Sequence, residues 1–321
     1  MLKKTFRILF MGTPDFAVES LRILHQHFEI VAVVTAPDKP RGRGQELSPT
    51  PVKQYAQSVG LPILQPSNLK SPEFIETLRL LKPELGVVVA FRMLPESVWS
   101  LPALGTINLH ASLLPQYRGA APINHALING ETITGVTTFF LQHEIDTGNI
   151  IRRVEVPIEP FDNAGTLHDK LMHIGAQALL ETVISIAEGN YHTIPQAQLE
   201  NEVLRSAPKI TKEFCQIDWN QSVEIIHNFI RGLSPYPGAY TYATIGEKPT
   251  MIKIYDGTPE NNQPFQVPGS IIMDKNSIKV ATLNGWYCIG ELQQSGKKRM
   301  KTSDFINGLQ QQTLECFYRH E

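Results

Sequence analysis

The sequence predicts an α/β protein with a Rossmann-like N-terminal domain and a smaller C-terminal β-barrel domain of OB type. Residues 7–11, 29–35 and 85–90 are short, almost continuously apolar runs, typical of parallel strands covered on both faces. Segments with helical periodicity separate these runs. In the C-terminal third, short strand-like segments follow one another with turn residues between them, a pattern that favours a small closed β structure.

Length and composition fit two ordinary globular domains. The chain has 321 residues, of which 42% are hydrophobic and 19% charged. Its net charge of -2 gives no general attraction for nucleic acid, so any RNA contact requires a local basic patch. Three cysteines without metal-type spacing indicate free thiols in a reducing compartment. Because no apolar run is long enough for a signal peptide or a membrane span, we expect a cytoplasmic monomer without membrane contact.

The N-terminal segment reads as strand, turn, helix and strand. Residues 7–11 form the first strand, Asp15 is expected to cap a helix that extends to Leu24, and residues 29–35 form the second strand. A dinucleotide site of this type requires three glycines in the turn, whereas this turn has Gly12 alone. The sequence therefore predicts a tight turn here and no dinucleotide site.

Residues 36–50 are rich in proline and glycine and are expected to form a long loop without regular structure. Lys39, Arg41 and Arg43 place three cations on this loop, which suit either RNA phosphates or simple solvation. The segments expected to follow are helices at 51–58 and at 72–81, the second capped by Ser71, and strands at 62–65 and 85–90.

Two polar side chains lie in a strand predicted to begin at residue 106. Asn108 and His110 alternate with apolar residues, so both leave the strand on the same side, near the end where open α/β sheets bind ligands. Asp146 lies in a turn between strands predicted at 132–141 and 150–157. An amide can donate to an oxyanion, an imidazole can exchange a proton near neutral pH, and a carboxylate can orient the imidazole or hold a water. Together these residue types offer a donor for an oxyanion and a group that can move a proton.

The remaining segments complete the expected architecture. We expect helices at 120–129 and 166–189, a polar linker at 191–208 and a helix at 222–232. The strands predicted for the C-terminal domain cover residues 239–245, 251–255, 270–272, 278–281 and 286–292.

Three motifs around these polar residues resemble the folate-dependent formyltransferases. They are Asn108-x-His110, the run from Ser112 to Gly119 (Ser-Leu-Leu-Pro-Gln-Tyr-Arg-Gly) and Asp146-Thr-Gly148, in the family's order and spacing. The resemblance extends over essentially the whole chain and is strongest between residues 106 and 148.

The resemblance implies catalysis by Asn108, His110 and Asp146 with 10-formyltetrahydrofolate as formyl donor. It also implies folate contacts from two segments, although residues 90–95 depart from the family pattern because Phe91-Arg92 replaces a longer, glycine-containing stretch. His143 and Glu144 flank the turn, but no further residue has metal-ligand spacing, so no metal is expected. The residues expected to bind folate are Ser112, Leu113, Leu114, Pro115, Phe91, Arg92 and Leu94.

The resemblance also bears on the formyl acceptor and on the domain bounds. Residues 230–239 are similar to the C-terminal domain of members that act on initiator methionyl-tRNA, and the basic loop resembles the one those members insert into the acceptor stem. An enzyme acting on nucleotide-linked amino sugars and a non-catalytic RNA-binding protein on the same scaffold are the alternatives. The expected parts are a catalytic domain at 1–190, a linker at 191–208 and a tRNA-binding domain at 209–321, with tRNA contacts from Lys39, Arg41, Arg43, Lys297, Lys298 and Arg299.

Overall fold

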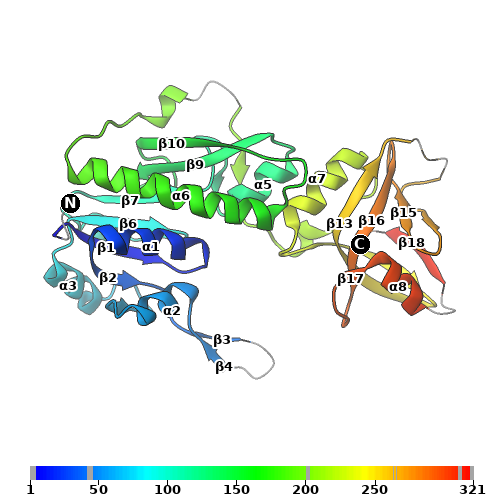
Figure 1. Ribbon diagram of the computed structural model, residues 1–321, viewed down its shortest axis with the longest axis horizontal. Helices are drawn as coiled ribbons and strands as arrows, with labels where there is room; N and C mark the ends of the chain where they lie inside the picture. Colours follow the sequence, from blue (N-terminus) through cyan, green and yellow to red (C-terminus); the bar gives the residue numbers. More distant parts are fainter. Residues whose placement is uncertain are drawn as a thin grey trace. The chain divides into compact units, whose positions relative to one another are not determined.

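The computed structural model describes residues 5–41, 46–199, 203–262, 264, 266–309 and 313–318 (Figure 1). The chain divides into two compact units, each made of several stretches of sequence. The first unit comprises Met1–Gly119, Ile133–Pro157 and His168–Ser206, and the second comprises Ala120–Thr132, Ile158–Leu167 and Ala207–Glu321.

The first unit is built on a seven-stranded sheet with the strand order β10-β9-β7-β6-β1-β2-β5. The five strands from β7 to β5 in this order pair in parallel, whereas β9 and β10 are antiparallel strands at one edge. The strands are β1 (Arg7–Gly12), β2 (Glu29–Val34), β5 (Ile63–Leu64), β6 (Leu85–Val89), β7 (Thr106–His110), β9 (Ile133–Phe140) and β10 (Ile150–Pro157).

The strand order places a switch point between β1 and β6. From β1 the chain proceeds to β2 and β5, then returns to add β6 and β7 on the other side of β1. Because β1, β6 and β7 are parallel, Gly12, Ala90 and His110 all lie at the carboxyl edge of the sheet. Open α/β sheets bind their ligands at such a point. His110 ends β7, the strand next to β6, at the same edge of the sheet.

Helices cover both faces of this sheet (Figure 1). On one face α1 (Phe16–His27) touches α6 (Ala164–Ala187), since the rings of Phe16 and His168 lie 5.2 Å apart, and the hydroxyls of Thr138 and Thr182 join β9 to α6 at 2.8 Å. On the opposite face α3 (Pro72–Leu81) and α4 (Glu96–Trp99) pack in one apolar core with Leu9 and Met11 of β1.

Two helix starts in this unit follow from their caps. The Thr50 hydroxyl accepts from the backbone N–H of Lys53 at the start of α2 (Pro51–Ser58), and that of Ser71 accepts from Phe74 at the start of α3. Proline occupies the first helical position in both, where its missing N–H costs nothing. Both helices have the predicted bounds.

Two sequence predictions in this unit are wrong. The side chain of Asp15 makes no capping hydrogen bond, because its backbone already has helical angles, and α1 continues three residues past Leu24. The basic loop at 36–50 contains a short antiparallel ribbon of β3 (Lys39–Arg41) and β4 (Glu46–Ser48). A ribbon this short with proline and charge in one strand carries no period-2 apolar pattern, so composition indicated a loop.

The second unit is centred on an antiparallel sheet with the order β14-β15-β16-β13-β12-β18, with β17 beside β16. The backbone N–H of Phe317 in β18 donates to the carbonyl oxygen of Gly269 at 2.8 Å, close to the start of β14, so the sheet forms a nearly closed barrel. Its strands are β12 (Ala239–Ile245), β13 (Lys248–Glu260), β14 (Ile271–Met273), β15 (Ile278–Ala281), β16 (Trp286–Gln294), β17 (Met300–Lys301) and β18 (Leu314–Tyr318).

The barrel core is covered by α7 (Val223–Leu233), whose Ile226 and Ile230 are buried with Tyr287 and Leu292. On its other side α7 packs against α5 (Pro122–Ile128), so closely that a Cβ on Gly232 would lie 2.6 Å from Ile128. The predicted barrel and the helix at 222–232 are confirmed. The sequence reading missed β17, β18 and α8 (Thr302–Leu309), the last three elements of the described chain.

Four short elements lie outside these layers. They are β8 (Arg118–Gly119), β11 (Ser206–Ala207) and the 3-10 helices η1 (Gln196–Leu199) and η2 (Glu213–Cys215). The residues described include no helix long and apolar enough to cross a membrane.

Candidate active site

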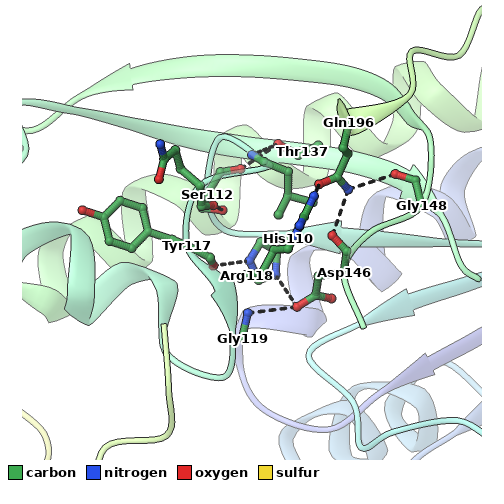
Figure 2. Close-up of polar contacts among 11 residues, drawn as sticks. His110, Ser112, Tyr117, Arg118, Gly119, Thr137, Asp146, Gly148 and Gln196 are labelled. Carbon is green, nitrogen blue, oxygen red and sulfur yellow. Dashed lines mark hydrogen bonds and ion pairs between the residues drawn. The ribbon is translucent and has the colours of Figure 1, made fainter. Parts of the chain in front are cut away.

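His110 is the last residue of β7 and points into a buried site at the carboxyl edge of the sheet. Its side chain is 8% exposed, and Nε2 lies 2.9 Å from the carbonyl oxygen of Tyr117. Because a carbonyl only accepts, Nε2 carries the proton. Nδ1 is therefore the nitrogen that faces Asp146, with an Oδ2 atom 3.9 Å away (Figure 2).

Asp146 lies in the turn between β9 and β10 and completes the other side of this site. Its Oδ2 atom accepts from the backbone N–H of Gly119 at 3.0 Å, and its side chain is 13% exposed. Its φ of 55° is in the left-handed region, which most residues avoid but Asp and Asn tolerate. Two residues on, a Cβ on Gly148 would overlap the carbonyl oxygen of Phe140, so this turn requires glycine there.

Asn108 lies two residues before His110 on β7, so both side chains leave the same face of the strand. It is half-buried, and among the described residues no group forms a hydrogen bond with its side-chain amide. The structure thus brings His110 and Asp146 together, and Asn108 lies two residues before His110 in the same strand. A half-buried amide without an internal partner has the chemistry that an oxygen with developing negative charge requires.

The loop after β7 is held by its own hydrogen bonds. The Ser112 hydroxyl donates to the carbonyl oxygen of Gln116 at 2.6 Å. Thr137 of β9 donates to the Ser112 carbonyl at 2.6 Å and accepts from the backbone N–H of Leu114 at 3.1 Å. Ser112, Leu114 and Pro115 are buried, so of the four folate contacts predicted in this loop only Leu113 is partly exposed.

The second predicted folate segment lies after β6 on the same edge. Phe91 and Leu94 are partly buried and pack against the core that contains Leu9 and Val88. The Arg92 guanidinium donates to the carbonyl oxygens of Pro66 and Ser67, and its carbon atom lies 5.8 Å from the centre of the Phe91 ring. Arg92 therefore fastens this segment to the strand edge at residues 66–67.

The residues predicted to bind tRNA lie in two places. Lys39 is exposed at the start of β3, Arg41 ends that strand, and Arg43 lies outside the described residues. In the second unit Lys297, Lys298 and Arg299 are all exposed before β17. Arg299 pairs with Glu291, with its guanidinium 4.5 Å from the centre of the Tyr255 ring, so that cation already has partners.

Gln196 of η1 is a site residue that sequence reasoning missed. It is 3% exposed, and its Nε2 atom donates to the carbonyl oxygens of Asp146 at 2.8 Å and Gly148 at 2.9 Å (Figure 2). Its Oε1 atom accepts from the Arg118 guanidinium. A polar residue in a polar stretch carries no local signal, so the sequence predicts only a polar linker at 191–208.

Within the described stretches, no set of three His, Cys, Asp or Glu side chains is placed to hold a metal ion. The groups that this part of the structure offers are a neutral amide, an imidazole and a carboxylate, with backbone groups around them.

A largely parallel sheet with this switch point, and with an amide, an imidazole and a carboxylate in this region, has side chains suited to acyl transfer. Comparison with known proteins gives the family. The family model described as formyl transferase matches residues 6–183, and the model of its C-terminal domain matches residues 209–310. The chain belongs to the formyl transferase family. It is 53% identical over 312 residues to a methionyl-tRNA formyltransferase of Bacteroides fragilis, covering 96% of each chain.

Solved structures with low sequence identity share the fold. An N-formyltransferase from Helicobacter canadensis, in complex with folinic acid and dTDP-3-aminofucose, has a TM-score of 0.64 at 20% identity, covering 94% of this chain and 100% of that one. HypX from Aquifex aeolicus, in complex with tetrahydrofolic acid, has a TM-score of 0.63 at 16% identity over 98% of this chain. The chain spans 51% of the length of HypX.

Proposed function

We propose that this chain transfers the formyl group of 10-formyltetrahydrofolate to the free amino group of initiator methionyl-tRNA. The observation that carries the proposal is the pair of His110 and Asp146 at the carboxyl end of β7, the strand that also contains Asn108. The acceptor follows from the full-length similarity to a relative named methionyl-tRNA formyltransferase. A role in translation initiation implies a cytoplasmic enzyme, and we expect it to act as a monomer.

Each of the three side chains has one task in this reaction. Asn108 donates a hydrogen bond to the formyl oxygen as negative charge develops on it. His110 accepts the proton that the attacking amine loses, at Nδ1, because Nε2 already donates to Tyr117. Asp146 stabilises the imidazolium formed 3.9 Å away. The new C–N bond forms as the bond between the formyl carbon and the folate nitrogen breaks, and His110 returns the proton to that nitrogen.

The folate donor fits the edge of the sheet between the two segments predicted for it. Tetrahydrofolate-type ligands in two solved neighbours of the same fold support a folate substrate. In this chain, Phe91, Leu94 and Leu113 are the partly exposed apolar side chains of those segments, and they are suited to contact a flat ring. Arg92 and the buried Ser112 position the segments.

The tRNA acceptor requires positive charge outside the catalytic site. Lys39, Arg41 and Arg43 of the basic loop at 36–50 carry the cations suited to phosphates of the acceptor stem. Lys297 and Lys298 offer a second contact in the tRNA-binding domain at 209–321. Because the net charge of the chain is -2, these clusters have to supply the attraction locally.

An acceptor assay tests the proposal. Purified protein is incubated with 10-formyltetrahydrofolate and, separately, with initiator methionyl-tRNA, elongator methionyl-tRNA or a dTDP-linked amino sugar. We expect formylmethionine on tRNA, formed fastest on the initiator. Formylation of the amino sugar with none on tRNA would establish the alternative activity, and tRNA binding without any formylated product would refute an enzymatic role.

Arg43→Ala tests the role in tRNA binding that we assign to the basic loop at 36–50. The variant should bind methionyl-tRNA more weakly, and the slope of log affinity against log salt should fall by about 1. Arg79→Ala, which removes an exposed arginine of α3, is the matched control and should leave both quantities unchanged. If Arg43→Ala and wild type have the same affinity for tRNA and the same salt dependence, Arg43 of the basic loop at 36–50 does not bind tRNA.

A further inference from the structure

The side-chain amide of Gln196 is fully used by two segments that are distant in sequence. Its two N–H groups donate to the carbonyl oxygens of Asp146 and Gly148, and its oxygen accepts from Nε and Nη2 of Arg118 at 3.0 and 2.6 Å. An amide has two donor hydrogens and two acceptor lone pairs, so no capacity remains. At 3% exposure, water cannot replace these bonds.

The two segments joined by Gln196 are those that hold His110 from opposite sides. In the loop at 117–119, the Tyr117 carbonyl oxygen accepts a hydrogen bond from Nε2 of His110, and the Gly119 N–H donates to the Asp146 carboxylate. The turn at 146–148 carries that carboxylate with a left-handed backbone. Gln196 links Arg118, which lies between Tyr117 and Gly119, to the backbone of Asp146.

From this arrangement we propose that Gln196 is a positioning residue for formyl transfer. It sets the distance between the Asp146 carboxylate and Nδ1 of His110 by fixing the turn against the loop at 117–119. The segment after α6 thereby takes part in the catalytic site. The inference rests on the proposed function, since it assigns Gln196 a role in the reaction that His110 and Asp146 serve.

The geometry distinguishes positioning from general support of the fold. The amide contacts the backbone of the two turn residues that flank Thr147, whereas its neighbour in η1, Gln198, is exposed and has no such contact. Backbone groups cannot compensate by choosing another rotamer. Loss of the two donors therefore moves the carboxylate, and a displacement of about 1 Å typically lowers a rate by about 10²-fold.

Gln196→Glu tests the proposal because it is nearly isosteric. The introduced carboxylate still accepts from Arg118 but cannot donate to the two carbonyl oxygens. We expect kcat to fall about 10- to 100-fold, with KM for tRNA and for folate unchanged. Gln198→Ala, a change in the same 3-10 helix, should match wild type. Equal kcat for Gln196→Glu and wild type, or equal losses in both variants, would overturn the proposal.

A double-mutant cycle with Asp146→Asn, which keeps the left-handed backbone at residue 146, gives a result that a purely structural role would not produce. If Gln196 acts through the Asp146 carboxylate, Gln196→Glu should lower kcat by less than about threefold in the Asp146→Asn background. If the kcat losses of the two single variants multiply in the double variant, the two residues act independently and the proposal is overturned. If circular dichroism shows that Gln196→Glu does not fold, Gln196→Asn, which is too short to reach both segments, takes its place with the same expectations. A wild-type protein without formylated tRNA product would instead refute the proposed function.

Discussion

Replacing Asp146 by asparagine removes a negative charge from the site with little change in shape. Asparagine accepts the hydrogen bond from the Gly119 N–H through its amide oxygen, as Oδ2 does now at 3.0 Å. Asparagine also tolerates the left-handed backbone at φ 55°, which alanine does not. We therefore expect Asp146→Asn to fold as wild type, so that a change in rate reports the charge.

The distance between the two side chains sets the size of the expected effect. Opposite unit charges 3.9 Å apart attract with about 4 kcal/mol at an effective dielectric constant of about 20. With only 8% and 13% of the two side chains exposed, salt screens this attraction weakly. Because the attraction exists once His110 has taken the proton of the amine, its loss raises the barrier. A decrease in kcat of about 10²- to 10³-fold is expected.

Single-turnover formylation of initiator methionyl-tRNA at saturating formyl donor measures this step. The rate of formylmethionyl-tRNA formation is compared between wild type and Asp146→Asn, with the thermal midpoint as the folding control. A folded Asp146→Asn protein whose single-turnover rate stays within about threefold of wild type would refute the charge argument. Asp146 would then act only through its hydrogen bond with Gly119.

Three further changes test other parts of the account. Asn108→Ala should lower kcat by about 10²- to 10³-fold with an unchanged thermal midpoint, since the amide has no partner among the described residues, and wild-type turnover would remove Asn108 from the mechanism. Gly148→Ala should lower both thermal midpoint and activity because its Cβ overlaps the Phe140 carbonyl, and an unchanged midpoint would contradict that packing. Ser71→Ala should cost about 1 kcal/mol of unfolding free energy without changing kcat, as denaturant unfolding and the formylation assay can show.

The parts of the fold that sequence predicted are those with a strong local signal. The apolar strands β1, β2 and β6 are buried on both faces, and the pairs of cap and proline at Thr50 and Ser71 define the starts of α2 and α3. The ribbon of β3 and β4 lacked such a signal, since each strand has only three residues and β3 contains proline and arginine. Its pairing came from the structure alone.

The candidate site likewise has one part that the sequence predicts and one part that it does not. The two-residue spacing of Asn108 and His110 predicts a shared face of a strand, and both residues lie in β7. The contacts of Gln196 join residues that are 50 and 78 positions apart in sequence, so no local pattern could predict them. A polar side chain that binds backbone carbonyls far away in the sequence can be recognised only once the folded structure is known.

A structure of the protein with bound 5-formyltetrahydrofolate, a stable relative of the donor, tests most directly whether the edge of β7 is where the formyl group reacts. The account predicts the pterin ring between the segments at 90–95 and 112–115, and the one-carbon position within about 3 Å of the Asn108 amide. A folate bound elsewhere, with Asn108 and His110 facing only solvent, would contradict it.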